Sequence, residues 1–334
     1  MSWAIPWHNI NEKKLKIAIV SKKNRIPVHG YGGTQRDIWA EGKVLNEKGH
    51  QVVFIVAKGS SCPFAEVIPY DASRSLDEQI PEGVDIVHLH HEPGEKLSRP
   101  YMVTIHGNGK PGELFDANTV FVSRNHAKRH GSTRFVYNGL DLDQLGVPDL
   151  KAKREGLLFL AKINRRVKNL KGSIDIARMA HKKLHVAGGW KLNFQPGIKY
   201  YGMVGGEKKS RLLQQSEALL FPVLWHEPLG LAILESMYYG LPVFGTPYGS
   251  LPELVSRERG YLSKSKSQLA HAIREYKGFD RKKCHEFVAD NFSDRKMTDE
   301  YLKLFEEVLS GKVLNDPRPR TQRSNQRVPF QMYE

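Results

Sequence analysis

Short apolar strands alternate with glycine-rich turns and helices along this chain, and the alternation constrains the fold more than any other feature. It opens with a strand over Lys16–Val20, a glycine-rich loop, a helix over Thr34–Glu47 and a strand over Gln51–Val56. Short apolar runs bounded by turn residues indicate strands buried on both faces, and intervening helices are typical of a parallel sheet. The sequence therefore predicts an α/β protein built from βαβ units.

The alternation occurs in two series, which predicts two domains. The first ends with an expected strand over Phe135–Tyr137, and the second runs from Leu157–Leu160 to Val243–Phe244. Between them, Asp141–Glu155 carries Pro, Gly and many charges, as a linker does. A length of 334 residues also suits two domains of ordinary size. We expect a first domain at 1–150, a second at 151–311 whose terminal helix (about 291–309) could return to the first, and a basic, disordered tail at 312–334.

Charge and cysteine content restrict the partners and the cellular compartment expected for the protein. The formal net charge of +15 indicates attraction to polyanions such as nucleic acid, an anionic membrane or phosphorylated substrates. Cys62 and Cys284 form no CxxC pair or metal spacing and are expected to be reduced thiols. We find neither a membrane-spanning apolar run nor the apolar core of a signal peptide, and expect a cytoplasmic protein. The Trp- and Lys-rich N-terminus favours peripheral contact with an anionic inner membrane face, through Trp3, Trp7, Lys13, Lys14 and Lys16.

Two glutamates eight positions apart, Glu227 and Glu235, carry the strongest chemical signal. They enclose the sequence Pro-Leu-Gly-Leu-Ala-Ile-Leu, in which Pro228 and Gly230 open a helix after a strand. The unpaired amides of a first helical turn suit a diphosphate, here those of Leu229, Gly230 and Leu231. Glu227, in the loop, could hold sugar hydroxyls, and Glu235, deeper in the helix, could hold a ribose diol. An amphipathic helix with two exposed acids would give the same pattern.

At this point the sequence resembles the nucleotide-sugar glycosyltransferases of family 4, in motifs that occur in the family's order along nearly the whole chain. The resemblance implies a GT-B fold, with two Rossmann-like, doubly wound parallel-sheet domains facing a central cleft. It also implies retaining transfer from a nucleoside-diphosphate sugar with no metal and no other cofactor. The further matching segments are Gly30-Tyr-Gly-Gly33, Thr104-Ile-His106-Gly107, Val122-Ser123, Tyr137-Asn-Gly139, Phe159-Leu-Ala-Lys162, Lys168-Asn-Leu170, His185-Val-Ala-Gly188-Gly189, Tyr201-Gly-Met-Val204, Gly240-Leu-Pro-Val243, Gly249-Ser-Leu-Pro-Glu253 and Asn291-Phe-Ser293.

The resemblance also assigns residues to roles. It places His106 beside the transferred sugar and makes Lys162 and Lys168 the cations on the diphosphate. Lys162 stands where the family has Arg, which exchanges a bidentate fork for a point charge, and one extra residue in the following loop leaves Lys171 as a rival to Lys168. The implied catalytic residues are His106, Lys162, Lys168 and Glu227. The implied donor-binding residues are Gly32, Gly33, Met203, Val204, Leu229, Gly230, Leu231 and Glu235. On the acceptor side we expect His91, Asn108 and Lys110.

Two other patterns suggest metal sites. Asp141-Leu-Asp143 imitates the DxD motif of a different glycosyltransferase fold, but it stands in the turn before the linker. His88 and His90 share one face of a strand and could begin a metal site, yet the sequence offers no convincing third ligand. We interpret these histidines as lining the ligand crevice near the acceptor at a strand end, with a plain packing role as the alternative, and expect no metal.

The sequence thus predicts a hexosyltransferase-type enzyme in cell-surface glycan, lipopolysaccharide or glycoconjugate biosynthesis. Its expected partners are a nucleotide-sugar donor, a glycan, lipid-linked or small-molecule acceptor, and an anionic membrane surface. Nucleic acid is not expected, since the basic runs 124–134 and 151–171 lack interleaved aromatic residues in a recognisable motif. Two alternatives stay open: a nucleotide-sugar epimerase of the same fold, and a non-catalytic basic glycan- or nucleic-acid-binding protein derived from a transferase.

Overall fold

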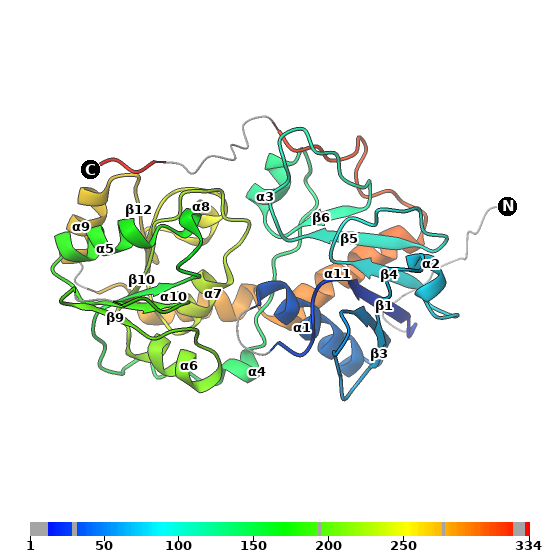
Figure 1. Cartoon of the computed structure of the whole chain (residues 1–334), viewed down its shortest axis with the longest axis horizontal. Coiled ribbons are helices and arrows are strands. Elements are labelled where there is room, and N and C mark those ends of the chain that lie inside the picture. The colour runs from blue at the N-terminus through cyan, green and yellow to red at the C-terminus, as the bar shows by residue number, and fades with distance from the viewer. Residues whose placement is uncertain (1–12, 29–31, 193–194, 276–277, 323–330) are drawn as a thin grey trace. The chain divides into compact units, whose positions relative to one another are not determined.

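Two compact units, each built on its own six-stranded parallel sheet, make up the structure (Figure 1). It is a computed structural model that describes residues 13–28, 32–192, 195–275, 278–322 and 331–334. Unit 1 comprises Met1–Gly139 with Asp294–Asn325, and unit 2 comprises Leu140–Ser293 with Gln326–Glu334. The predicted α/β class and pair of doubly wound parallel sheets are confirmed.

Unit 1 has the strand order β3-β2-β1-β4-β5-β6. Successive strand residues point to opposite faces, so that Ile17 and Ile19 pack toward α1 and α11 while Ala18 and Val20 pack toward α2. The strands are β1 Lys16–Ser21, β2 Gln51–Val56, β3 Glu66–Pro69, β4 Ile86–Leu89, β5 Tyr101–Ile105 and β6 Thr119–Phe121. The helices are α1 Gly33–Glu47, α2 Leu76–Gln79, α3 Arg124–Arg129 and α11 Asp294–Leu309.

Unit 2 repeats the same topology, with the order β12-β11-β10-β7-β8-β9. The strands are β7 Leu157–Leu160, β8 Leu184–Ala187, β9 Ile198–Tyr200, β10 Ala218–Phe221, β11 Val243–Gly245 and β12 Gly260–Leu262. The helices are α4 Leu142–Leu145, α5 Leu170–Met179, α6 Gly206–Gln215, α7 Leu231–Tyr238, α8 Leu251–Leu254, α9 Lys266–Arg274 and α10 Arg281–Asn291, with a short 3₁₀ helix, η1, at Arg166–Lys168.

The order of the strands reverses between β1 and β4 in unit 1 and between β7 and β10 in unit 2. In doubly wound sheets, ligands bind outside the carboxyl ends of the strands at such a reversal. The loops that follow β7 and β10 are therefore the first place to look for a site in unit 2, and those that follow β1 and β4 in unit 1.

The boundary between the units differs from the one expected near Lys151, because the chain leaves unit 1 after Gly139. Polar contacts attach the supposed linker to unit 2. The hydroxyls of Tyr238 and Tyr239 donate to the carbonyls of Gly146 and Leu145, and Arg281 donates to the carbonyl of Leu150. Its charges and its Pro and Gly residues gave it the composition of a linker, but these bonds make it part of a folded unit.

The described part of the tail also differs from the expectation of disorder, since Lys312–Gln322 packs on unit 1, while residues 323–330 lie outside the described residues. Asn315 is buried, donates to the carbonyls of Ala117 and Thr119, and accepts from the Ser132 hydroxyl. Arg320 forms an isolated antiparallel bridge with Leu114. Polar and main-chain bonds hold this segment, which composition alone does not predict. Among the described residues, no helix is both long and apolar enough to cross a membrane.

Candidate functional site

A buried lysine and a buried glutamate meet where the strand order of unit 2 reverses. Lys168 ends η1, in the loop after β7, and Glu227 lies in the loop after β10. Lys168 Nζ lies 2.6 Å from Glu227 Oε2, and the two side chains are 9% and 7% exposed. The indole Nε1 of Trp225 donates to the same carboxylate oxygen at 2.6 Å. The structure thus brings Lys168 to Glu227, whereas its rival Lys171 is an exposed residue of α5.

Asn169 fixes the loop that carries Lys168. Its backbone is left-handed (φ 58°), a conformation that Asn adopts more readily than most residues. Its side chain accepts from the amide of Gly172 and donates to the carbonyl of Pro222 at the end of β10, at 3.0 and 2.9 Å. On the other side of Lys168, the carbonyl of Val167 accepts from the amide of Leu224 at 2.8 Å. Both chain neighbours of Lys168 are therefore bonded to the segment after β10.

Gly249 fixes the backbone of Glu227. The two residues form an isolated parallel bridge, and the amide of Ser250 donates to the Glu227 carbonyl at 2.9 Å. A Cβ on Gly249 would lie 2.2 Å from that carbonyl oxygen, and its φ of 69° is left-handed. A glycine at this position therefore allows the close approach that places Glu227.

The second glutamate of the motif, Glu235, forms its own buried ion pair. It lies in α7, and its Oε1 is 2.6 Å from Nζ of Lys209 in α6. Glu227 and Glu235 are only 6% and 5% exposed, so the alternative of an amphipathic helix with two exposed acids is wrong. Gly230, the N-cap of α7, has φ 91° and no side chain with which to cap the helix, whose first-turn amides can then bond an anion. Leu229 is buried and Leu231 is partly buried there.

Other predicted residues of unit 2 follow β7 and β9. Lys162 is half-buried just after β7, where Gly188 approaches the carbonyl of Ala161 so closely that a Cβ would lie 2.0 Å from it. After β9, Met203 is 50% exposed and Val204 is buried. These residues share the carboxyl edge of the sheet with Lys168 and Glu227.

In unit 1, the predicted residues follow β4 and β5 or begin α1. Gly32 precedes α1 and Gly33 is its first residue, while Gly30 and Tyr31 lie outside the described residues, as do Trp3 and Trp7. The acceptor-side candidates differ in their contacts: His91 bonds the carbonyl of Glu92, Asn108 accepts from Arg129, and Lys110 is exposed.

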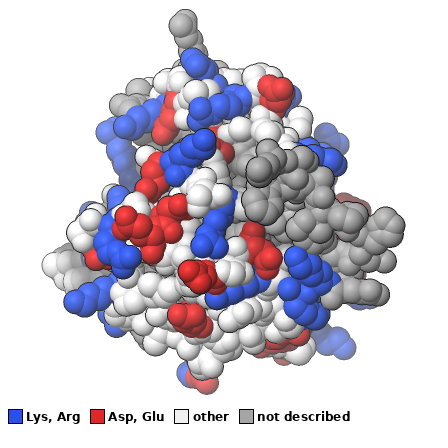
Figure 2. Space-filling view, turned by 90° about the vertical axis from the view of Figure 1, so that its right-hand side faces the viewer, with Lys and Arg blue, Asp and Glu red and all other residues white. Residues whose placement is uncertain are grey.

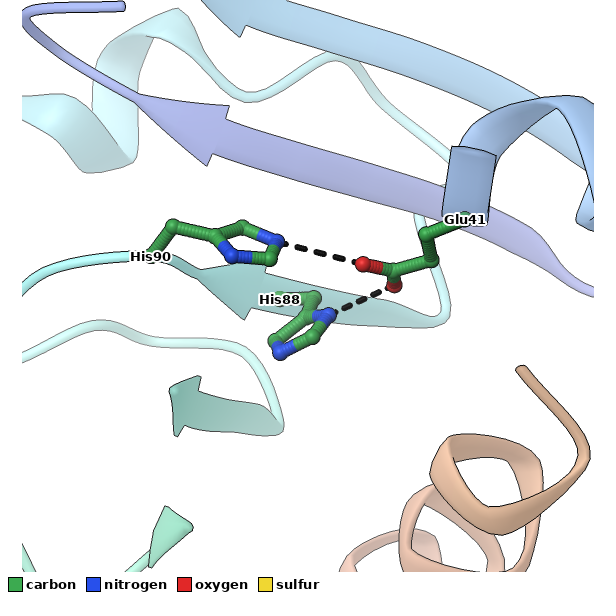
Figure 3. A group of neighbouring side chains, drawn as sticks. All are labelled: Glu41, His88 and His90. Carbon is green, nitrogen blue, oxygen red and sulfur yellow. Dashed lines mark hydrogen bonds and ion pairs between the residues drawn. The ribbon is translucent and has the colours of Figure 1, made fainter. Parts of the chain in front are cut away.

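His106 follows β5 and belongs to a buried histidine cluster on the face covered by α1. Its Nε2 lies 2.8 Å from Nδ1 of His90. Glu41 of α1 bonds both His88 and His90, so the third side chain that the sequence did not reveal is Glu41 (Figure 3). Burial raises the pKa of Glu41, but the charges and hydrogen bonds of the two imidazoles outweigh it and lower this pKa to about 2.

These three side chains could hold a metal ion, yet their spacing is that of hydrogen bonds. Glu41 Oε1 is 2.6 Å from His88 Nδ1, and Glu41 Oε2 is 3.1 Å from His90 Nε2. Ligands at the usual bond length from a tetrahedral zinc ion would lie roughly 3.3 Å apart, so an ion would have to push this first pair apart.

Trp225, Lys209 and Glu41 contribute to these sites but escaped the sequence analysis. Lys209 stands in the basic run Lys208-Lys209 of a helix, and Glu41 stands in a helix whose partners are 47 and 49 positions away. Local spacing cannot reveal such pairs. The position of Trp225, two residues before Glu227, was the one available signal.

Comparisons with known proteins agree with this architecture. Residues 152–276 match the family model described as "Glycosyl transferases group 1". The chain is 28% identical over 119 residues to an uncharacterized 41.2 kDa protein in the cps region of Klebsiella pneumoniae, a match that spans 32% of each chain and hence about a third of that relative's length. The matched family segment contains Lys162, Lys168, Glu227 and Glu235.

Solved structures match over both units. AviGT4, a glycosyltransferase involved in avilamycin A biosynthesis, is 20% identical with a TM-score of 0.70 over 90% of this chain and 100% of that chain. Sucrose-phosphate synthase from Thermosynechococcus elongatus is 17% identical with a TM-score of 0.69 over the same shares. Anabaena HepE in complex with UDP-glucose is 14% identical with a TM-score of 0.63 over 89% of this chain and 100% of that chain. The fold is GT-B.

Replacing Gly249 by alanine is expected to destabilise unit 2, because the new methyl group would collide with the Glu227 backbone. Gly146→Ala is the matched control, since Gly146 has the same φ of 69° but nothing within 4 Å of its Cβ position. The control should lose only the strain of its positive-φ backbone, about 1–3 kcal/mol. Gly249→Ala should lose clearly more in urea denaturation and change the fluorescence of Trp225. Equal losses would contradict the role of Gly249 as a spacer.

Proposed function

We propose that this chain is a retaining glycosyltransferase of family 4 that transfers a hexose from a nucleoside-diphosphate sugar without a metal ion. The observation that carries the proposal is the buried Lys168–Glu227 pair at the strand-order reversal of unit 2. It lies within the segment that matches the glycosyltransferase family model. HepE, which shares the fold, is described in complex with UDP and with UDP-glucose, and this supports a uridine nucleotide as the first donor to test.

The chemistry requires stabilisation of a leaving group. As the bond from sugar to diphosphate breaks, negative charge builds on the phosphate, and preorganised cations and amides lower the energy of that state. Lys162, Lys168 and the amides of Leu229–Leu231 are the groups that we assign to it. The leaving phosphate then takes the proton of the acceptor hydroxyl, which arrives on the same face of the sugar.

The pairing of Lys168 with Glu227 suits this task. In the free protein each neutralises the other, which keeps a buried charge tolerable. On donor binding, the diphosphate becomes a second anionic partner for Lys168, and sugar hydroxyls donate to Glu227. Glu235 then holds the ribose, with Lys209 fixing its orientation.

For the acceptor we propose a glycan or lipid-linked saccharide in cell-surface glycan biosynthesis, met by the loops of His91, Asn108 and Lys110. Attachment to the inner membrane face would be electrostatic, given the charge of +15. Figure 2 shows one face on which Lys and Arg are interspersed with Asp and Glu, so total charge and the N-terminal segment, more than this face, would drive membrane attachment.

The protein should sediment with anionic vesicles at low salt and be released as ionic strength rises. Failure to sediment at low salt would exclude this attachment.

The enzyme should first be matched to its donor by screening nucleotide sugars for thermal stabilisation and slow hydrolysis. With that donor, Lys168→Ala should lower kcat/KM on the order of 10²- to 10³-fold, because one stabilising charge on the leaving group is lost. Lys171→Ala is the matched control and should keep normal turnover, since Lys171 is exposed. The reverse result would place the second phosphate cation at Lys171. If the product were an epimerised nucleotide sugar, the enzyme would be an epimerase and not a transferase.

The two glutamates should fail differently when shortened. Glu227→Ala should lower kcat because it misaligns the sugar, and should leave affinity for uridine diphosphate unchanged or raise it, since Lys168 loses its competing partner. Glu235→Ala should weaken diphosphate binding and raise the donor KM, because the ribose does not change during the reaction. Calorimetric titration with uridine diphosphate measures both. Equal weakening, or a loss confined to Glu227→Ala, would overturn the assignment.

A further inference from the structure

His106 is the outer end of a continuous hydrogen-bonded chain that runs into the core of unit 1. Its Nε2 lies 2.8 Å from His90 Nδ1, and His90 Nε2 lies 3.1 Å from Glu41 Oε2. The other carboxylate oxygen bonds His88, whose second nitrogen lies 2.8 Å from the Thr104 hydroxyl. The side chains of Glu41, His88 and His90 are fully buried, whereas that of His106 is 12% exposed.

Secondary structure explains why these side chains meet. His88 lies in β4 and His90 directly follows it, while Thr104 lies in the adjacent β5 and His106 directly follows that strand. Alternation along a strand puts all four on one face. Figure 3 shows Glu41 reaching from α1 to both histidines of the β4 segment.

The ionised carboxylate fixes the direction of every hydrogen bond toward His106. Glu41 can only accept, so the His90 Nε2 that faces it must carry a hydrogen. Burial and the charge of His88 lower the pKa of His90 to about 4, which keeps this imidazole neutral. Its Nδ1 therefore carries a lone pair and accepts from Nε2–H of His106. Burial, and then the charge of His90, also lower the pKa of His106 well below its ordinary value, so the Nδ1 of His106 is left as a lone pair.

The opposite arrangement of hydrogens loses bonds at both ends. It would set a bare His90 Nε2 against the Glu41 carboxylate and remove one of the two bonds that compensate a buried charge. In return, Nδ1–H of His106 would face Asp37 Oδ2 at 3.6 Å, which is too long for a hydrogen bond. His106 Nδ1 has no hydrogen-bond partner among the described residues.

We propose that Glu41 is a positioning residue for sugar transfer: acting through His90, it holds His106 in the Nε2–H tautomer and so offers the Nδ1 lone pair to a hydroxyl of the transferred sugar. This inference rests on the proposed function and on the family resemblance, which implies that His106 lies beside that sugar. The oriented imidazole accepts a hydroxyl hydrogen without any rearrangement of hydrogens during binding. The second branch of the carboxylate, through His88, does not touch His106.

A bound metal ion would reverse the arrangement. His88 Nδ1 and His90 Nε2 would then be metal ligands without hydrogens, His90 would donate from Nδ1 to His106, and His106 would carry its hydrogen at Nδ1. The tautomer of His106 and the metal content of the purified protein therefore distinguish the two arrangements.

The test uses ¹⁵N-labelled histidine in the full chain, because imidazole nitrogen shifts report which nitrogen carries the hydrogen. In the wild type, His106 should be protonated at Nε2, and the purified protein should carry no divalent ion. His90→Phe should release this preference and lower kcat at least about tenfold, equivalent to about 1.4 kcal/mol, with little change in nucleotide affinity. His88→Phe is the matched control, because it also deprives Glu41 of one imidazole. It should keep the Nε2–H tautomer of His106 and a kcat within about threefold of the wild-type value.

His90→Gln provides the rescue, since an amide offers one hydrogen-bond donor for Glu41 and one acceptor for His106. It should recover most of kcat and the Nε2–H tautomer, and it serves as the test variant if His90→Phe does not fold. Equal losses in the His88 and His90 variants with an unchanged tautomer would reduce the cluster to a structural role. A wild type protonated at Nδ1, or a bound ion at Glu41, would also overturn the proposal. A wild type that binds no nucleotide sugar would instead overturn the proposed function, whatever the tautomer.

Discussion

The buried ion pair of Lys168 and Glu227 is the interaction on which the site in unit 2 depends. Removing two charges from water is costly, and removing one partner of such a pair typically costs about 3–5 kcal/mol because a buried charge is left alone. The surrounding loops are built to avoid that state. Asn169 and Val167 attach the lysine loop to the segment after β10, and Gly249 holds the glutamate backbone. The cation is therefore in place before any ligand arrives.

Unit 1 also compensates a buried carboxylate, but with different side chains. Its reversal in strand order also lies beside a buried carboxylate, Glu41, but imidazoles rather than an ammonium group bond it. A lysine supplies a full charge that a diphosphate can use. A neutral imidazole supplies no charge but transmits a direction, because one ring nitrogen must donate when the other accepts. The two sheets share one topology and present different functional groups at equivalent edges.

Elements with strong local signals were predictable from the sequence, and those made by distant partners were not. The buried strands β1 and β2 contain unbroken apolar runs, whereas β3 is half-exposed and escaped prediction. The strand expected over Phe135–Tyr137 forms only a single bridge to Phe121, since it lies where the sheet already ends. The resemblance assigned Lys168 and Glu227 to the donor site. It could not supply Lys209 or Glu41, because each is a charged helix residue whose partner is set by tertiary packing.

The lowered pKa values of the histidine cluster bear on both stability and orientation. The unfolded chain protonates His90 near its ordinary value of 6.5, but the folded chain does so only at about 4. The unfolded state thus binds more protons in this window, and His90 makes unit 1 less stable as pH falls from about 6.5 to about 4. Glu41 acts in the same direction at lower pH, since its contribution to stability is complete above pH 4.5 and is lost as pH falls to about 2.

Burial also raises the pKa of Tyr301, which bonds Thr104, well above its ordinary value. Around neutral pH, Glu41 is therefore ionised and His90, His106 and Tyr301 are neutral. The protonation state of His106 thus does not change with pH there, as that of a solvent-exposed histidine would.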